Sequence, residues 1–197
     1  MRLKLTAETS LLEPNVDHGF VTWWHFEVVG DDDPTLIVGH GRVAKILTGQ
    51  ALNYGQRIYD VLDADSGELE ALYAVYFKGK QAMPDLDEGA GSDILYFDEL
   101  TVESSWQNRN IDLAIAKRIE EMLGDGCAII ILPYETEQEA VHWGRMGFQV
   151  TQPTTEQEIG YLHLHLAMRT ARVVDPDRND QFRVIPNPSP MRKAKQH

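Results

Sequence analysis

The sequence predicts an α/β domain in which helices flank a mixed, twisted sheet, and three neighbouring stretches carry this prediction. Residues 94–102 are dense in β-branched and aromatic side chains and long enough for one buried strand. After a polar turn at residues 103–109, apolar side chains recur at the helical period. They are Ile111, Ile115, Ile119, Met122 and Leu123. A glycine-containing stop at 124–126 then leads into the apolar run 127–132, as expected of a strand covered on both faces.

Two strands and two helices are expected before this central unit. Residues 19–29 and 36–47 are β-prone and are joined by a turn-rich linker at 30–34, which predicts a hairpin. Trp23, Trp24 and Phe26 should pack in the core, with a cleft wall as the alternative. Residues 50–62 are expected to be helical, and Asp65 and Ser66 should cap a second helix. The Gly-, Pro- and Asp-rich residues 79–92 are expected to form a loop.

The part after residue 132 predicts a short helix, a final strand pair and a tail. Residues 135–146 are expected to be helical and to end at Gly147, and residues 148–150 and 160–168 are expected to pair as strands. Residues 169–197 hold 7 Lys and Arg against 3 Asp, with four prolines, which predicts an extended or disordered tail. We therefore expect a domain at 1–168 and a basic tail at 169–197. The tail would lie on its own acidic domain or a twin subunit, or serve as an arm for an acidic partner.

Composition narrows the function classes. The 197 residues carry a formal net charge of −13, which argues against nucleic acid as a main partner because phosphate binding needs clustered Lys and Arg. The one cysteine, Cys127, excludes an intrachain disulfide and fits the cytoplasm. The longest apolar run, 128–133, is far shorter than the ~20 residues of a membrane span. A soluble cytoplasmic protein without a membrane partner is expected.

The central unit resembles the GCN5-related N-acetyltransferase superfamily. Residues 99–102, Glu-Leu-Thr-Val, match the family's Glu-Leu-x-Val strand pattern, and residues 146–148, Met-Gly-Phe, match the end of its later helix. In the turn between them Gln107 matches the first position of the family's loop, whereas Asn110 and Asp112 stand where the family has small residues, glycine first and then glycine or alanine. The resemblance covers roughly residues 94–168.

The resemblance implies an acetyl-CoA-dependent transferase that acts on a small-molecule or peptide amine, and relatives are often homodimers. It implies that the backbone of the strand would hold the thioester and pantetheine, and that the loop would hold the pyrophosphate. The implied coenzyme-binding residues are Leu100, Thr101, Val102, Gln107, Asn108, Arg109, Asn110, Ile111 and Asp112.

The two loop replacements differ in their expected effect. Asn tolerates a positive φ better than most residues, so Asn110 would preserve the turn and is also a good N-cap. Asp112 suits the first turn of a helix, but its carboxylate would repel or displace a pyrophosphate there.

The resemblance also suggests three catalytic side chains. Glu99 is the candidate general base, because burial among Phe97, Leu100 and Trp106 would make its carboxylate more basic. A structural carboxylate is the other interpretation of Glu99, and strand alternation would place Asp98 on the opposite face. Trp143 stands where relatives often carry a proton-donating Tyr. His142 and Tyr134 are the candidate replacements, unless they only pack or face solvent.

Three functions remain open at the level of the sequence. The first is an acyl-CoA-dependent N-acyltransferase, and the second is a binding or regulatory module that kept the fold and lost acetyl-CoA. The third is a doubly wound domain with another ligand at its strand ends, which a sheet without a splay between its central strands would favour. His163 and His165 share one strand face but lack an obvious third ligand, so no metal is expected.

Overall fold

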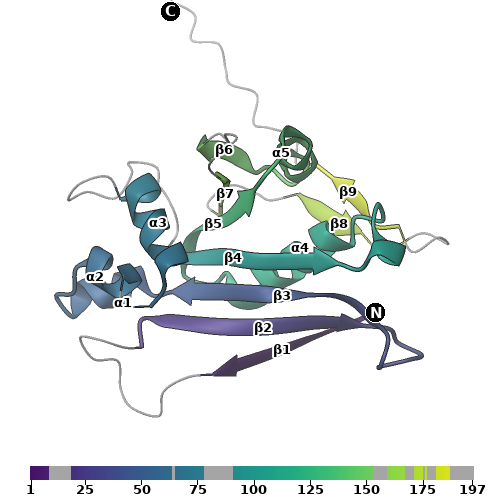
Figure 1. Cartoon of the computed structure of the whole chain (residues 1–197), viewed down its shortest axis with the longest axis horizontal. Coiled ribbons are helices and arrows are strands. Elements are labelled where there is room, and N and C mark those ends of the chain that lie inside the picture. Colours follow the sequence, from purple (N-terminus) through teal and green to yellow (C-terminus); the bar gives the residue numbers. More distant parts are fainter. Residues whose placement is uncertain are drawn as a thin grey trace, which may run out of the picture.

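The computed structural model describes residues 1–8, 19–63, 65–77, 91–152, 159–166, 171–174, 176 and 181–186. A seven-stranded sheet in the order β1-β2-β3-β4-β5-β7-β6 organises them (Figure 1). All neighbours are antiparallel except β4 and β5, which are parallel, so the sheet is mixed as predicted. Within the described residues no helix is both long enough and apolar enough to cross a bilayer.

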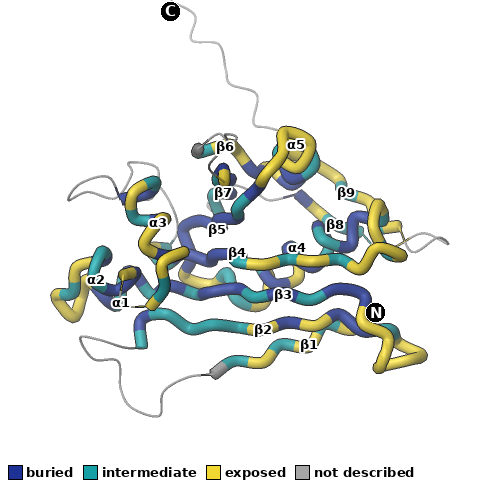
Figure 2. Tube along the Cα trace, viewed as in Figure 1, coloured by how far each residue is buried: buried dark blue, intermediate teal, exposed yellow. Residues whose placement is uncertain are grey.

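The strands of the predicted hairpin and of the central unit form as expected. They are β2 (Val21–Val29), β3 (Ile37–Ile46), β4 (Asp93–Val102), β5 (Cys127–Tyr134), β6 (Gln149–Gln152) and β7 (Gly160–His165). β5 is buried along nearly its whole length, because the sheet is covered on both faces there (Figure 2). One strand was missed, the edge strand β1 (Arg2–Glu8), which pairs with β2.

The helices lie on the two faces of the sheet. α4 (Ile111–Leu123) packs on one face, and the helices α1 (Thr48–Asn53), α2 (Ile58–Asp63) and α3 (Gly67–Tyr76) pack on the other. We call these the α4 face and the α1–α3 face. α5 (Glu137–Gly144) follows β5 and also joins the α4 face. Ser66 and Thr136 cap α3 and α5, each accepting a hydrogen bond from the backbone N–H three residues later.

Two helix predictions need correction. The helix expected at 50–62 is split into α1 and α2, because Gly55 between them has a φ of +75°, which an α-helix does not accommodate. Three strands precede the helices, rather than the two expected, since β1 comes first. The helix expected at 135–146 is also shorter, because Thr136 caps it and Gly144 is its last residue.

The described part of the expected tail packs on the domain. β8 (Arg172–Val174) and β9 (Arg183–Ile185) pair as an antiparallel hairpin, and Ala171 is buried against the α4 face. The Phe182 N–H donates to the Arg109 carbonyl at 2.9 Å, which ties this hairpin to the turn before α4. The boundary predicted at residue 168, and most of the loop predicted at 79–92, lie outside the described residues.

The close approach of β3 to β4 gives a first stability prediction. A Cβ atom on Gly41 would overlap the Glu99 carbonyl oxygen and lie 2.5 Å from the Phe26 ring. We expect Gly41→Ala to lower the free energy of unfolding by about 3 kcal/mol, because neither the backbone nor the buried ring can move away cheaply. Denaturant unfolding measures this change. Gly67→Ala is the control, because no atom lies within 4 Å of its added Cβ. Equal stability of both variants would contradict the prediction.

Candidate active site

The two central strands separate halfway along their length. β4 and β5 pair from Asp93 and Cys127 only as far as Tyr96 and Ile131. Beyond that point β4 continues paired to β3 alone and β5 continues paired to β7 alone, and β5 diverges from β4 in Figure 1. The splay counts against the doubly wound alternative, which a sheet without a splay would have favoured. It also leaves the inner edge of β4 without a strand partner among the described residues.

A cleft of about 610 Å³ opens where the strands separate. Its walls are the diverging halves of β4 and β5, the turn after β4, the first turn of α4 and the inner side of α5. Of the predicted site residues, it is lined by Glu99, Leu100, Thr101, Val102, Gln107, Asn108, Asn110, Ile111, Asp112, Tyr134 and His142. Arg109 is the exception, because its guanidinium lies over the Trp106 ring, 4.7 Å from the ring centroid, and does not line the cleft.

The turn between β4 and α4 presents backbone amides at the mouth of the cleft. Asn108 and Asn110 have φ values of +62° and +57°, so Asn110 preserves the turn as the sequence predicts. Among the described residues no acceptor bonds the N–H groups of Asn108, Asn110, Ile111 or Asp112. Alternating left-handed residues and a helix N-terminus together direct such N–H groups toward one point and make a site suited to an anion.

Asn110 occupies the N-cap position without capping the helix by its side chain. Its amide nitrogen instead donates to the Phe182 carbonyl at 2.5 Å, and its amide oxygen accepts from Arg145 at 2.8 Å. The capping role predicted for this side chain is therefore wrong. Its actual role is to fasten the turn to the C-terminal hairpin and to the end of α5.

Asp112 does not fold back onto the free amides. Its carboxylate lies 2.6 Å from Nε2 of His142 on α5, and both side chains are only partly exposed. The pair joins the first turn of α4 to the last turn of α5. The negative charge of Asp112 remains near the mouth of the cleft. Its carboxylate, however, is bonded by the His142 imidazole and not by the backbone amides of the turn. Nδ1 of His142 has no partner among the described residues.

Glu99 differs most from its prediction. Its side chain is 55% exposed, so the burial expected among Phe97, Leu100 and Trp106 is wrong. The cause is a β-bulge, because Arg42 and Val43 of β3 face Glu99 and Phe97 and leave Asp98 as an extra residue of β4. The bulge shifts the alternation, so that Leu100 and Val102 pack on the α4 face together with Phe97. Glu99 lies 3.6 Å from His40, which also lies 3.9 Å from Glu103.

Asp98 belongs to the site, although the sequence analysis did not include it among the site residues. Its side chain is 15% exposed, lines the cleft and accepts a hydrogen bond from Nε of Arg42 at 2.9 Å. Asp98 is therefore the structural partner of Arg42. Its predicted placement opposite Glu99 is wrong, because Arg42, which pairs with Glu99 across β3 and β4, bonds the Asp98 carboxylate on that same face.

Several other side chains bear on the chemistry. Tyr134 is buried in the cleft wall, and Trp143 is buried against Phe148. Glu135 and Glu139 at the start of α5 also line the cleft and were not predicted. Cys127 lies at the other end of β5, and burial raises its pKa to about 11, so it is no reactive thiol. Among the described residues no group of three or more metal-ligating side chains could hold a metal ion.

Known proteins resemble this fold at low sequence identity. No family model matches the sequence, and no curated protein matches it either. NAA60 from Arabidopsis thaliana, solved in complex with acetyl-CoA, matches with 15% identity and a TM-score of 0.42 over 77% of this chain and 79% of its own. Arylalkylamine N-acetyltransferase 2 from Aedes aegypti matches with 12% identity and a TM-score of 0.44 over 72% and 73%. The latter is an N-acetyltransferase by name. Because these likenesses are distant, we argue function from the geometry of this chain.

Proposed function

We propose that the protein is an acyl-CoA-dependent N-acyltransferase that transfers an acetyl group from acetyl-CoA to an amine. The observation that carries the proposal is the separation of β4 and β5 beyond Tyr96, with free amides at the N-terminus of α4 beside it. An unpaired strand edge can bind an extended pantetheine as it would bind an added strand, and N–H donors at one end of that edge can bind the pyrophosphate. Both lie along one cleft.

The chain offers groups for each part of such a substrate. The backbone of Leu100, Thr101 and Val102 borders the cleft and would bond the pantetheine, as an added strand would. The amides around Asn108, Asn110, Ile111 and Asp112 would hold the pyrophosphate. Gln107 donates its side-chain amide to the Val102 carbonyl at 3.4 Å and so fixes the turn to the strand.

The reaction requires two proton movements. The amine nitrogen forms a bond to the thioester carbonyl carbon, the carbon–sulfur bond breaks, and the amine loses one proton while the thiolate gains one. We assign the first movement to Glu99, directly or through water, since it lines the cleft beside β4. We assign the second to His142, which Asp112 orients through Nε2. Tyr134 is the second candidate donor in the same wall.

A binding or regulatory module without the coenzyme is the second candidate function. The Asp112 carboxylate favours it, because a negative charge in the first turn of α4 opposes an incoming pyrophosphate even while His142 holds it. The two functions differ in whether the full chain binds acetyl-CoA. Calorimetry decides between them: binding in the micromolar range supports the transferase, and no binding at millimolar coenzyme supports the module.

Neutralising Asp112 tests how this charge acts. Asn keeps the shape and the hydrogen bond to His142 but removes the charge, so we expect Asp112→Asn to bind acetyl-CoA about 5-fold more tightly. The measurement is the dissociation constant by calorimetry at low salt. Glu121→Gln removes the same charge from the far end of α4 and is the control, for which we expect no change. Weaker binding by Asp112→Asn would show that the carboxylate supports the site rather than obstructing it.

A further inference from the structure

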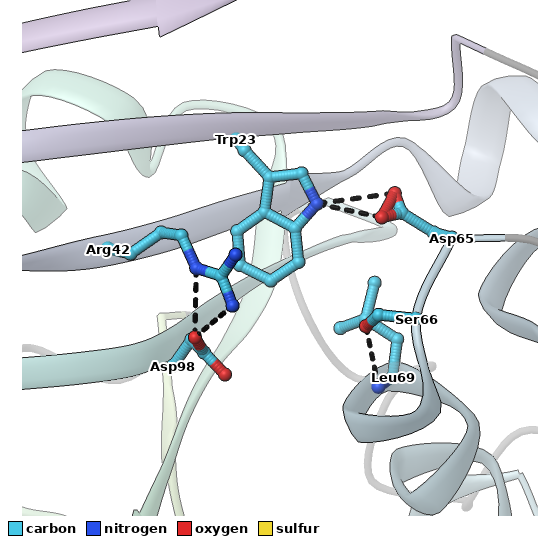
Figure 3. Close-up of polar contacts among 6 residues, drawn as sticks. All are labelled: Trp23, Arg42, Asp65, Ser66, Leu69 and Asp98. Atoms are coloured by element: carbon cyan, nitrogen blue, oxygen red, sulfur yellow. Dashed lines mark hydrogen bonds and ion pairs between the residues drawn. The ribbon is translucent and has the colours of Figure 1, made fainter.

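A second group of polar side chains lies on the α1–α3 face beside the separated strands. Arg42 of β3 stacks on the Trp23 ring of β2, with its guanidinium carbon 4.2 Å from the ring centroid, while Nε bonds Asp98 of β4 (Figure 3). The indole nitrogen of Trp23 donates to Asp65 at 2.7 Å, beyond the other end of the ring. The Trp23 ring thus carries the Arg42 guanidinium on its face and has a carboxylate on each of two sides, that of Asp98 and that of Asp65.

Tyr96 lies on the same face as this group, because it pairs with Ala44 of β3, which in turn pairs with Trp23. The residue is 3% exposed, yet its hydroxyl makes no hydrogen bond with any described residue. Every fully buried side-chain nitrogen or oxygen among the described residues has a partner, so the Tyr96 hydroxyl must reach solvent. A nearly buried phenol that opens to solvent and lacks a partner is a group suited to meet a ligand. The half-buried Tyr161 of β7 also makes no such bond.

The charges around the two phenols are mainly negative. Burial raises the pKa of Tyr96 and Tyr161, and the charges of Asp98 and Glu68 raise the pKa of each further. The group holds three carboxylates, Asp65, Glu68 and Asp98, and one guanidinium, that of Arg42, which bonds Asp98. The excess of carboxylate beside an aromatic ring is the chemistry that selects cations.

We propose that this group, Trp23, Asp65, Glu68, Tyr96, Asp98 and Tyr161, binds the acceptor and selects an amine that carries a second, cationic group. The proposal rests on the proposed transferase function. The reacting nitrogen must be neutral when it attacks, so a carboxylate-rich subsite serves a charged group elsewhere on the acceptor. The guanidinium of Arg42 occupies the aromatic face in place of that group and partly neutralises Asp98.

Calorimetry with simple amines tests the charge selection on the full chain, without coenzyme. The probes are 1,4-diaminobutane, n-butylamine and 4-aminobutyrate. Each has an amine at one end of a four-carbon chain, and the other end is an ammonium, a methyl or a carboxylate group, respectively. We expect the diamine to bind about 10-fold more tightly than either of the others. Preference for 4-aminobutyrate, or equal affinity for all three, would overturn the proposal.

Two variants test the assigned groups. Tyr96→Phe removes only the hydroxyl, so it should weaken diamine binding about 3-fold to 10-fold, whereas Tyr54→Phe on the exposed surface of the α1–α2 turn should leave it unchanged. Arg42→Gln removes the internal cation and should tighten diamine binding about 3-fold. Weaker binding of the diamine by Arg42→Gln, with unchanged melting temperature, would overturn the proposal. None of these measurements involves acetyl-CoA, so their failure is distinct from failure of the transferase function.

Discussion

Glu99→Gln is expected to lower kcat about 100-fold and to change the affinity for acetyl-CoA by less than about twofold. The amide fills the same space as the carboxylate but cannot accept the proton that the amine must lose. Because Glu99 is largely exposed, the proton passes to solvent after each turnover without a conformational change. The measurement is thiol release from acetyl-CoA with a panel of primary amines, alongside calorimetric titration of the coenzyme.

Glu103→Gln is the matched control for this experiment. Glu103 lies on the other side of His40 and does not line the cleft, so its replacement removes the same charge from the same histidine neighbourhood. We expect this variant to retain turnover. Equal turnover of Glu99→Gln and the wild type would remove Glu99 as the base, and an equal fall in both variants would assign the effect to the charge around His40.

The central unit was predictable because its signals are local. The apolar density of β4 and β5, the helical period of α4 and the polar turn between them depend on neighbours within a few residues. The positive φ of Asn110 could also be predicted from the sequence, because asparagine tolerates that conformation by itself. Strand β1 carries a local signal of the same kind, since Leu3, Leu5 and Ala7 alternate with polar residues.

The misjudged parts of the site depend on contacts between distant segments. The bulge at Asp98 arises in the pairing of β4 with β3, and no pattern within residues 93–102 marks it. Without the bulge, strand alternation puts Asp98 and Glu99 on opposite faces and gives the wrong environment for both. Asp112 and His142 are 30 positions apart in the sequence. The sequence therefore revealed the charge of the Asp112 carboxylate but not that His142 is its partner.

The link between the C-terminal hairpin and the turn before α4 also joins distant segments, so the sequence did not predict it. Phe182 bonds this turn with both of its backbone groups, its N–H to Arg109 and its carbonyl to Asn110. Composition after residue 168 predicted an extended segment, and the described strands are extended. Composition allowed this segment to lie on its own domain, but it did not identify the α4 face, on which Ala171, Val173, Phe182 and Val184 pack.

Replacing Asn110 should therefore destabilise the whole domain as well as the turn. The residue is 8% exposed and its side chain bonds both Phe182 and Arg145, so Asn110→Ala removes two hydrogen bonds and forces alanine into a φ of +57°. We expect the free energy of unfolding to fall by about 3–5 kcal/mol, the sum of two lost hydrogen bonds and the left-handed strain. Denaturant unfolding measures this change.

Two further variants divide this loss between its causes. Asn110→Gly removes the bonds without the strain, so it should remain about 1 kcal/mol more stable than Asn110→Ala. Asn108→Ala imposes the same strain at a φ of +62° on an exposed residue whose side chain bonds no described residue, and it should cost only about 1 kcal/mol. Asn110→Gly introduces the glycine that the N-acetyltransferase superfamily resembled by the sequence has at this position, yet it releases the turn from Phe182. We expect its affinity for acetyl-CoA to fall about 3-fold, because the coenzyme must then order the turn itself. Wild-type stability of Asn110→Gly would show that the bonds to Phe182 and Arg145 do not hold the turn.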